Sequence, residues 1–352
     1  MDKYRSKRLE NVEPYVPGEQ PKDGVFIKLN TNENPYPPSP KAFAAIRAAA
    51  CDTLRLYPKP EYDGLRAAMA EFTGLGDSQI YAGNGSDEVL ATAFLAFFAP
   101  GSRIIFPDIS YSFYPVYADL FGIKYDMIPL RADFTIDVKA MTRESGGVVI
   151  ANPNAPTGVA LPLPDIEYIV KNNAERIVIV DEAYVDFGCE SAVPLIYRYP
   201  NLLVIQTMSK SRSFAGLRVG FAMGQKSLID AMSAVKNSFN SYTLDRLAQA
   251  GAEAAVRDRE YFDETRNRII ATREHTAMEL RKLGFTVLPS SANFVFASHK
   301  SVPAEQIFAA LREKGILVRH FNKPRIDNFL RITIGTDNEM DELCAALREI
   351  VG

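Results

Sequence analysis

Three clusters of polar residues each follow a short apolar run rich in isoleucine and valine. The clusters are residues 152–158, 181–184 and 207–210, and the runs before them are 147–151, 176–180 and 202–206. Such continuous apolar runs are typical of strands buried on both faces of a parallel sheet. Ligands bind outside the carboxyl ends of the strands in these sheets. The three clusters are therefore predicted to form one site.

A carboxylate, a phenol and a lysine at one buried site have a specific chemical use. Pyridoxal phosphate withdraws electrons only while its pyridine nitrogen is protonated, and a facing aspartate maintains that proton. Asp181 is the candidate for this role, and Tyr184 would adjust the basicity of the imine. Lys210 must lose its proton to attack an aldehyde, and a desolvated, partly cationic pocket would lower its pKa from about 10.4.

Each motif taken alone has a simpler interpretation. Asp181-Glu182-Ala183-Tyr184 after a strand is more often a helix cap or a fragment of a metal site. The run Asn154-Ala155-Pro156-Thr157-Gly158 is most often a turn, because proline and glycine are turn formers. Gly83-Asn84-Gly85-Ser86 before a helix could bind phosphate through free N–H groups and the helix dipole. Only the order of these motifs along one chain favours a cofactor site.

The elements that position these residues alternate between strand and helix. We expect helices at 43–50, 64–72, 87–98, 114–121 and 165–173, with further short strands at 79–81 and 103–106. After Leu244 the pattern changes to a helix at 259–283, strands at 285–288, 293–297, 317–321 and 329–334, and a helix at 304–314. Thr336-Asp337-Asn338-Glu339 is a capping box that begins a last helix ending at Val351.

This order predicts an α/β fold with two domains. We expect an N-terminal arm over residues 1–30 and a large domain over 31–245, with a mostly parallel central sheet flanked by helices. A smaller α+β domain would follow over 246–352.

Composition and charge exclude several classes of protein. The 352 residues are 47% hydrophobic and 24% charged, and the net charge of −3 provides no basic field for nucleic acid or an anionic membrane surface. The three cysteines form no C-x-x-C pair, and the three histidines are isolated, which argues against a metal site. The charged N-terminus is unlike a signal peptide, and no apolar run approaches the ~20 residues of a membrane span. We expect a soluble cytoplasmic protein.

The ordered motifs resemble the fold-type I pyridoxal-phosphate enzymes of the class I/II aminotransferase family, and within it the histidinol-phosphate aminotransferases. The matching stretches are L-N-T-N-E-N-P (29–35), Y-P (57–58), G-N-G-S-D-E (83–88), P-x-x-S-Y (107–111), N-A-P-T-G (154–158), D-E-A-Y (181–184), S-K-x-x-x-x-A-G-L-R-x-G (209–220) and L-R-I-T-I-G-T (330–336). They cover nearly the whole chain.

The resemblance implies a role for each matching cofactor residue. Lys210 would bind the cofactor covalently and act as general base for the 1,3-proton shift, while Asp181 would pair with the pyridinium nitrogen. Tyr184 and Asn154 would hydrogen-bond the ring 3-oxygen, and Tyr111 would stack on the ring. The phosphate would be bound by backbone N–H groups of Ser86 and Asp87, by the hydroxyls of Thr207 and Ser209, by Arg218, and by Tyr57 across the interface of a homodimer with shared active sites.

The resemblance also implies the substrates. Arg331 and Arg319 would bind substrate anions, and Tyr15 with the arm around Asn30 to Asn34, including Asn32, would close over them. Ordinary surface packing is the alternative for the arm. The implied reaction converts L-histidinol phosphate and 2-oxoglutarate into imidazole acetol phosphate and L-glutamate by a ping-pong mechanism.

Other activities on the same scaffold stay open. An aromatic amino acid aminotransferase would use Tyr111 and Tyr15 beside the arginines, and a threonine-phosphate decarboxylase would share the layout. A regulatory sensor of this fold would usually carry a winged-helix domain, for which we see no basic recognition helix. The chain departs from the family pattern at Ala155, where a second asparagine is usual, and in the polar segment 211–214.

Overall fold

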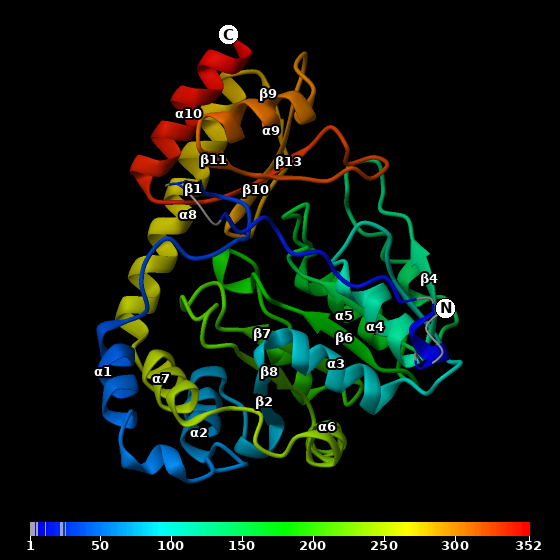
Figure 1. Ribbon diagram of the computed structural model, residues 1–352. Helices are drawn as coiled ribbons and strands as arrows, with labels where there is room; N and C mark the ends of the chain where they lie inside the picture. Colours follow the sequence, from blue (N-terminus) through cyan, green and yellow to red (C-terminus); the bar gives the residue numbers. More distant parts are fainter. Residues whose placement is uncertain (1–3, 5, 11, 22–23, 25) are drawn as a thin grey trace.

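A seven-stranded sheet lies at the centre of the computed structural model, which describes residues 4, 6–10, 12–21, 24 and 26–352 (Figure 1). Its strands are, in spatial order, β2 (Ile80–Asn84), β8 (Val219–Met223), β7 (Leu202–Thr207), β6 (Val178–Asp181), β5 (Val148–Ala151), β3 (Arg103–Pro107) and β4 (Lys124–Ile128). β8 is antiparallel to both of its neighbours, and the other pairs are parallel. The predicted α/β fold with a mostly parallel sheet is confirmed.

Both faces of this sheet are buried. Val148 and Ile150 of β5 belong to one apolar cluster, whereas Val149 and Ala151 belong to the cluster on the opposite face. The first cluster includes residues of α1 (Pro40–Ala49), α2 (Asp63–Thr73), α5 (Leu163–Lys171) and α7 (Arg246–Arg257), and the second includes residues of α3 (Gly85–Phe97), α4 (Phe113–Phe121) and α6 (Lys226–Phe239). Burial on both faces explains why these strands read as continuous apolar runs.

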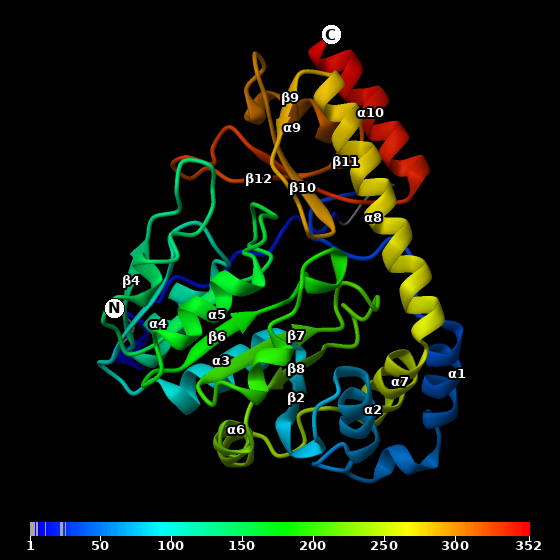
Figure 2. The same cartoon turned by 180° about the vertical axis from the view of Figure 1, so that it is seen from behind.

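A smaller α+β unit follows in the chain. Its antiparallel sheet has the order β12 (Arg319–His320), β13 (Leu330–Thr333), β10 (Phe294–His299) and β9 (Phe285–Val287). It packs with α8 (Arg259–Lys282), α9 (Ala304–Glu313) and α10 (Asp337–Val351), and β1 (Ile27–Lys28) pairs in parallel with β11 (Ile316–Leu317). Figures 1 and 2 show α8 running from α7 and α1 to this unit. The capping box is confirmed, because the Thr336 side chain accepts a hydrogen bond from Glu339 N.

Four elements of the central unit were absent from the sequence-based expectation: β4, β8, α6 and α7. β4 is the edge strand K-Y-D-M-I and is only partly buried, so it lacks a long apolar run. α7 shares the apolar cluster of the central sheet with α1 and α2, although it follows residue 245. The domain limits at 30 and 245 therefore stay a prediction.

Short 3-10 helices complete the element list. They are Lys7–Leu9, Asp52–Arg55, Asp77–Gln79, Ala140–Thr142, Val185–Phe187 and Val193–Tyr197. Among the residues that the structure describes, no helix combines the length and the apolar character needed to cross a bilayer.

Candidate active site

The three polar clusters follow the carboxyl ends of three neighbouring strands in the central sheet. β5, β6 and β7 are parallel neighbours, and Asp181 at the end of β6 lies in register with Ala151 on one side and Ile205 on the other. The Asn152 N–H donates to the Asp181 carbonyl at 2.8 Å. The fold therefore brings the segments that follow these strands together.

Asp181 is a buried carboxylate with two hydrogen-bond donors. The Tyr114 hydroxyl donates to its Oδ2 at 2.9 Å, and the Ala183 N–H donates to its Oδ1 at 3.2 Å. Burial raises the pKa of Asp181 to about 6, against the effect of these two bonds, which favour the charged form. Sequence analysis missed Tyr114. Tyr114 lies in the first turn of α4, three residues after Tyr111, and this closeness in the chain was the available signal.

Lys210 lies in a desolvated position beside Tyr184. Its Nζ donates to the Thr31 carbonyl at 3.3 Å and lies 5.9 Å from the centre of the Tyr184 ring. Desolvation, together with the nearby charge of Arg331, lowers the pKa of Lys210 to about 8, against the opposite effect of Glu33. A substantial fraction of the amine is therefore neutral near neutral pH.

An anion cradle forms where α3 begins. Asn84, the N-cap residue, makes no side-chain capping hydrogen bond, so its side chain leaves the N–H groups of Ser86 and Asp87 uncapped. Arg218 Nη2 lies 2.8 Å from Asp87 Oδ2, and Arg218 Nη1 donates to Ser209 Oγ at 3.3 Å. The Ser209 N–H donates to Thr207 Oγ1 at 3.2 Å.

Two glycines leave this cradle open. A Cβ on Gly220 would lie 2.5 Å from Ser86 N, and a Cβ on Gly85, whose φ is +78°, would collide with the Arg218 guanidinium. Backbone donors, two hydroxyls and one guanidinium are the donor set that a phosphate group requires. With Lys210 and Asp181 at the same sheet edge, the residues fit pyridoxal phosphate.

Tyr111 and Asn154, two of the predicted cofactor residues, make side-chain hydrogen bonds to other residues of the chain. The Tyr111 hydroxyl donates to Asp87 Oδ1 at 2.7 Å, which places this ring beside the cradle. Asn154 Nδ2 donates to the Ile109 carbonyl and to Thr157 Oγ1, both at 2.9 Å. Its Oδ1 is buried and has no partner within the described part of the chain.

Tyr57 is not brought to the cradle within one chain. Its side chain is 77% exposed, and its ring stacks on Tyr242 with the centroids 4.5 Å apart. Its predicted contact with the phosphate therefore depends on a second subunit.

Arg319 and Arg331 lie directly opposite each other on β12 and β13. Both guanidinium carbons lie 5.6 Å from the centre of the Phe321 ring. Arg331 Nη2 donates to the Asn30 carbonyl at 2.9 Å, while its Nε is buried without a partner in the described chain. Like charges directly opposite destabilise a sheet. A bound anion would relieve this repulsion.

The N-terminal arm contacts both the arginines and Tyr184. Asn32 Nδ2 donates to the Tyr184 hydroxyl at 2.9 Å, and the Asn32 N–H donates to Thr333 Oγ1 at 3.0 Å. Arg319 donates to the Val16 carbonyl at 3.4 Å, and the neighbouring Tyr15 ring stacks on Phe113 at 4.4 Å. The arm thus lies along the predicted substrate side of the site.

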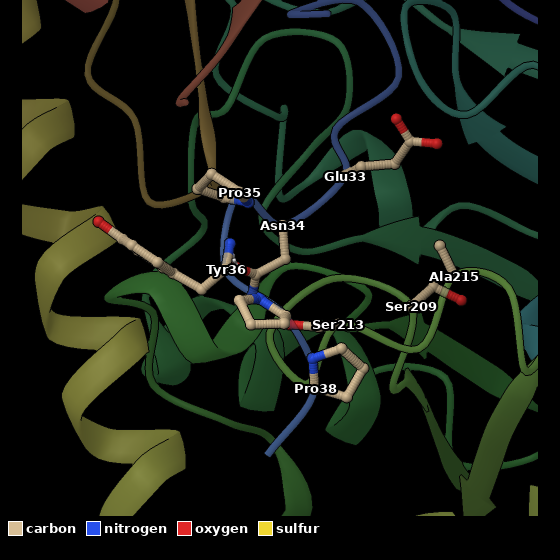
Figure 3. Close-up of a pocket in the computed structure, with 9 residues that line it drawn as sticks. Glu33, Asn34, Pro35, Tyr36, Pro38, Ser209, Ser213 and Ala215 are labelled. Carbon is tan, nitrogen blue, oxygen red and sulfur yellow. Dashed lines mark hydrogen bonds between the residues drawn. The ribbon is translucent and has the colours of Figure 1, made fainter. Parts of the chain in front are cut away.

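A cavity of about 410 Å³ opens beside the cradle. It is lined by the proline-rich run Glu33 to Pro38 and by Ser209, Ser213 and Ala215, and Figure 3 shows Ser209 and Ala215 together and Ser213 close to the proline-rich run. Asn34 Nδ2 links the proline-rich run to the segment that follows β7, because it donates to the carbonyls of Lys210 and Ser211, at 2.9 and 3.2 Å. This contact was also missed from the sequence.

Arg212, the cation in the unusual segment 211–214, points into helix packing. Its guanidinium carbon lies 4.0 Å from the centre of the Phe262 ring and 4.7 Å from that of Phe72. Its Nη1 donates to the Ala255 carbonyl at 2.8 Å. The Arg212 guanidinium therefore packs between α2, α7 and α8.

The chain matches known proteins over its whole length. A family model described as aminotransferase class I and II matches residues 25–347. A Clostridium acetobutylicum protein named histidinol-phosphate aminotransferase is 55% identical over 351 residues, which cover 100% of both chains. Histidinol-phosphate aminotransferase 1 of Bordetella parapertussis is 58% identical over 353 residues, which cover 99% of both chains.

The fold likewise matches solved structures. The crystal structure of histidinol-phosphate aminotransferase from Sinorhizobium meliloti in complex with pyridoxal-5'-phosphate superposes with a TM-score of 0.90 at 26% identity, covering 99% of this chain and 98% of that chain. From the family match and the full-length relatives together, the chain belongs to the class I and II aminotransferases.

Proposed function

We propose that this protein uses pyridoxal phosphate to transfer the amino group of L-histidinol phosphate to 2-oxoglutarate, giving imidazole acetol phosphate and L-glutamate. The observation that carries the cofactor assignment is the placement of Lys210 and Asp181 at one sheet edge beside an anion cradle. The substrate assignment is supported by the names of relatives that are more than half identical to the chain.

Each residue of the site would have a separate role in the reaction. Bound pyridoxal phosphate supplies an electron-withdrawing ring that makes the Cα proton of the amino donor acidic. Asp181 would hold a positive charge at the ring nitrogen, and Tyr184 and Asn154 would orient the ring through its oxygen. Lys210 would take up and release the Cα proton at its Nζ, for which its lowered pKa of about 8 is suited.

The two opposed arginines would serve both substrates. Histidinol phosphate presents a phosphate and no carboxylate, whereas glutamate presents two carboxylates. A guanidinium group matches either anion with two parallel hydrogen bonds. Arg331, whose buried Nε has no partner among the described residues, and Arg319 opposite it would therefore accept either anion in turn. Tyr15 and Asn32 would cover the substrate from the arm.

The proposal includes a homodimer in the cytoplasm. Leu54, Leu56, Tyr57, Phe239 and Tyr242 are exposed large apolar side chains on two segments. Arg246 joins these segments by donating to the Leu56 and Tyr57 carbonyls. An exposed apolar patch of this kind supports a subunit interface, through which Tyr57 would reach the partner's phosphate site. The three free cysteines suit a reducing compartment.

An aromatic amino acid aminotransferase is the second candidate, favoured by the contact of Tyr15 and Tyr111 with Phe113 at 4.4 and 5.5 Å. Steady-state assays with histidinol phosphate, phenylalanine and tyrosine as donors distinguish the two. We expect kcat/KM to be highest for histidinol phosphate. The cofactor assignment fails if the purified protein is colourless, binds no added pyridoxal phosphate and shows no absorbance change with L-glutamate.

A further inference from the structure

The loop between β12 and β13 reaches from the small unit onto the large one. Its Arg325 donates from Nη2 to the carbonyls of Leu130 and Arg131, at 2.9 and 2.8 Å, and from Nη1 to Asp108 Oδ2 at 3.2 Å. Figures 1 and 2 both show this loop beside the segment that follows β4. One side chain thus joins three acceptors across the two units.

The acceptor Asp108 is held by backbone hydrogen bonds close in the chain to Tyr111, a predicted cofactor residue. Its Oδ1 accepts hydrogen bonds from the Ile109 and Leu130 N–H groups, at 2.8 and 2.9 Å. Asp108 also precedes by three residues Tyr111, whose hydroxyl binds Asp87 in the anion cradle. The Arg325 contact therefore ends on the segment that carries Tyr111.

An aromatic wall connects Arg325 to the two substrate arginines. The Arg325 guanidinium lies 5.6 Å from the centre of the Phe134 ring, which packs edge-on against Phe329 at 5.4 Å. Phe329 stacks on Phe296 at 4.7 Å, and Phe296 contacts Phe321 at 6.4 Å. Phe321 is the ring over which both Arg319 and Arg331 lie.

The strand that carries Arg319 has few residues in regular pairing. β12 has two residues and lies at the edge of its sheet, where it pairs only with β13. The like charges of Arg319 and Arg331, directly opposite each other, disfavour the same pairing. The backbone of Arg325 has a φ of +71°, which is costly for a residue other than glycine and persists only where surrounding contacts maintain it.

We propose that Arg325 is a positioning residue that fixes the β12–β13 hairpin, and with it Arg319 and Arg331, against the large unit for substrate binding. The proposal rests on the amino transfer proposed above. An isolated surface ion pair contributes little. Arg325 differs because it joins one carboxylate and two backbone carbonyls on the other unit, and because the hairpin that it holds carries both anion-binding groups.

The test is Arg325→Gln in the cofactor-loaded protein, with KM and kcat measured for histidinol phosphate and for 2-oxoglutarate. We expect both KM values to rise by about tenfold, since a small displacement of binding groups weakens binding by at least this order, while kcat stays within about twofold. Cofactor absorbance and Tm should match the wild type. Arg325→Lys, which keeps the charge but cannot fork to three acceptors, should be intermediate.

Two further variants separate positioning from loss of charge. Arg348→Gln removes an exposed arginine whose ion pair, with Glu279, stays inside the small unit, and it should leave both KM values unchanged. Asp108→Asn should give part of the Arg325→Gln effect and add little to it in the double variant, because the two groups form one contact.

The outcomes distinguish failure of this inference from failure of the proposed function. If the wild-type protein shows no absorbance change with L-glutamate, the proposed amino transfer is wrong. If the wild type reacts, the inference is overturned by unchanged KM values in Arg325→Gln, by an equal rise in Arg348→Gln, or by additive effects of Arg325→Gln and Asp108→Asn. It is likewise overturned if KM rises only together with a fall in Tm and cofactor content.

Discussion

The Tyr114 hydroxyl donates a 2.9 Å hydrogen bond to the Asp181 carboxylate, linking the helix on one face of the central sheet to the end of its middle strand. Both side chains are buried. A buried carboxylate keeps its charge only with such donors, because burial alone favours the protonated form. Tyr114 thus supports the charge that Asp181 would need in its proposed role opposite a protonated ring nitrogen.

Tyr114→Phe should weaken cofactor binding. Loss of a hydrogen bond to a charged group costs about 1.5–3 kcal/mol, so we expect the Kd for pyridoxal phosphate, measured by absorbance titration, to rise at least about tenfold. Tyr199→Phe is the matched control, because its hydroxyl donates to the Glu167 carboxylate on the surface, at 2.6 Å. Equal Kd values for the two variants would contradict the role given to Tyr114.

Lys210→Ala should abolish turnover and leave a folded protein, since among the described residues Lys210 Nζ makes a single hydrogen bond, to Thr31 at 3.3 Å. In the wild type, the rate at which the cofactor-free chain takes up pyridoxal phosphate should rise with pH and level off above about 8, as the amine loses its proton. At pH 7.5 this pKa leaves about a quarter of the amines neutral, against about 0.1% for an ordinary lysine. Borohydride reduction followed by peptide mapping should label Lys210, and a label elsewhere would refute the assignment.

Arg331→Ala should weaken substrate binding by roughly 2–5 kcal/mol, because a desolvated charge pair is lost. The KM for histidinol phosphate and for glutamate should both rise by at least about thirtyfold, and Arg331→Lys should be intermediate because it keeps the charge without the planar fork. Steady-state kinetics in both directions give this result. Wild-type KM values for both substrates would remove Arg331 from the site.

Tyr57→Phe should lower cofactor affinity by about five- to tenfold if its hydroxyl binds the phosphate of the partner subunit. The control is Tyr242→Phe, in the ring that stacks on Tyr57. Sedimentation should show a dimer for the wild type and both variants. A monomeric wild type, or an equal loss of affinity in the two variants, would exclude the shared site.

Glu182→Gln should flatten the pH dependence of stability. Burial raises the pKa of Glu182 to about 7 from an ordinary 4.5, although Ala192 N–H and Ser191 donate to the carboxylate. Between these pH values the folded chain holds a proton that the unfolded chain has released, so wild-type stability falls as pH rises through this window. The wild type should lose about 1–3 kcal/mol more than Glu182→Gln between pH 4.5 and 7. Urea denaturation at the two pH values measures this, and an equal loss in both proteins would contradict it.

Much of the fold could be predicted from local pattern. Runs such as 147–151 are continuously apolar because successive side chains point to opposite faces of the sheet and helices cover both faces. This pattern can be recognised from the residues of the run alone. The strand β4 and the helix α7 could not be predicted in the same way. β4 is half-solvated at the edge, and the place of α7 in the large apolar cluster depends on contacts with α1 and α2, far away in sequence.

The sequence by itself determined the chemistry of the site, because residue types at strand ends specify donors, acceptors and charges, and parallel strands bring their carboxyl ends together. Lys210 and Asp181 were predicted in this way, whereas Arg218 was predicted from the family resemblance. Only the tertiary structure decided which groups lie beside the predicted site residues: Tyr114 beside Asp181, Thr31 beside Lys210, and Arg319 opposite Arg331. These pairs join residues from 12 to 179 positions apart. No local pattern encodes them, because such distances are set by the packing of whole elements.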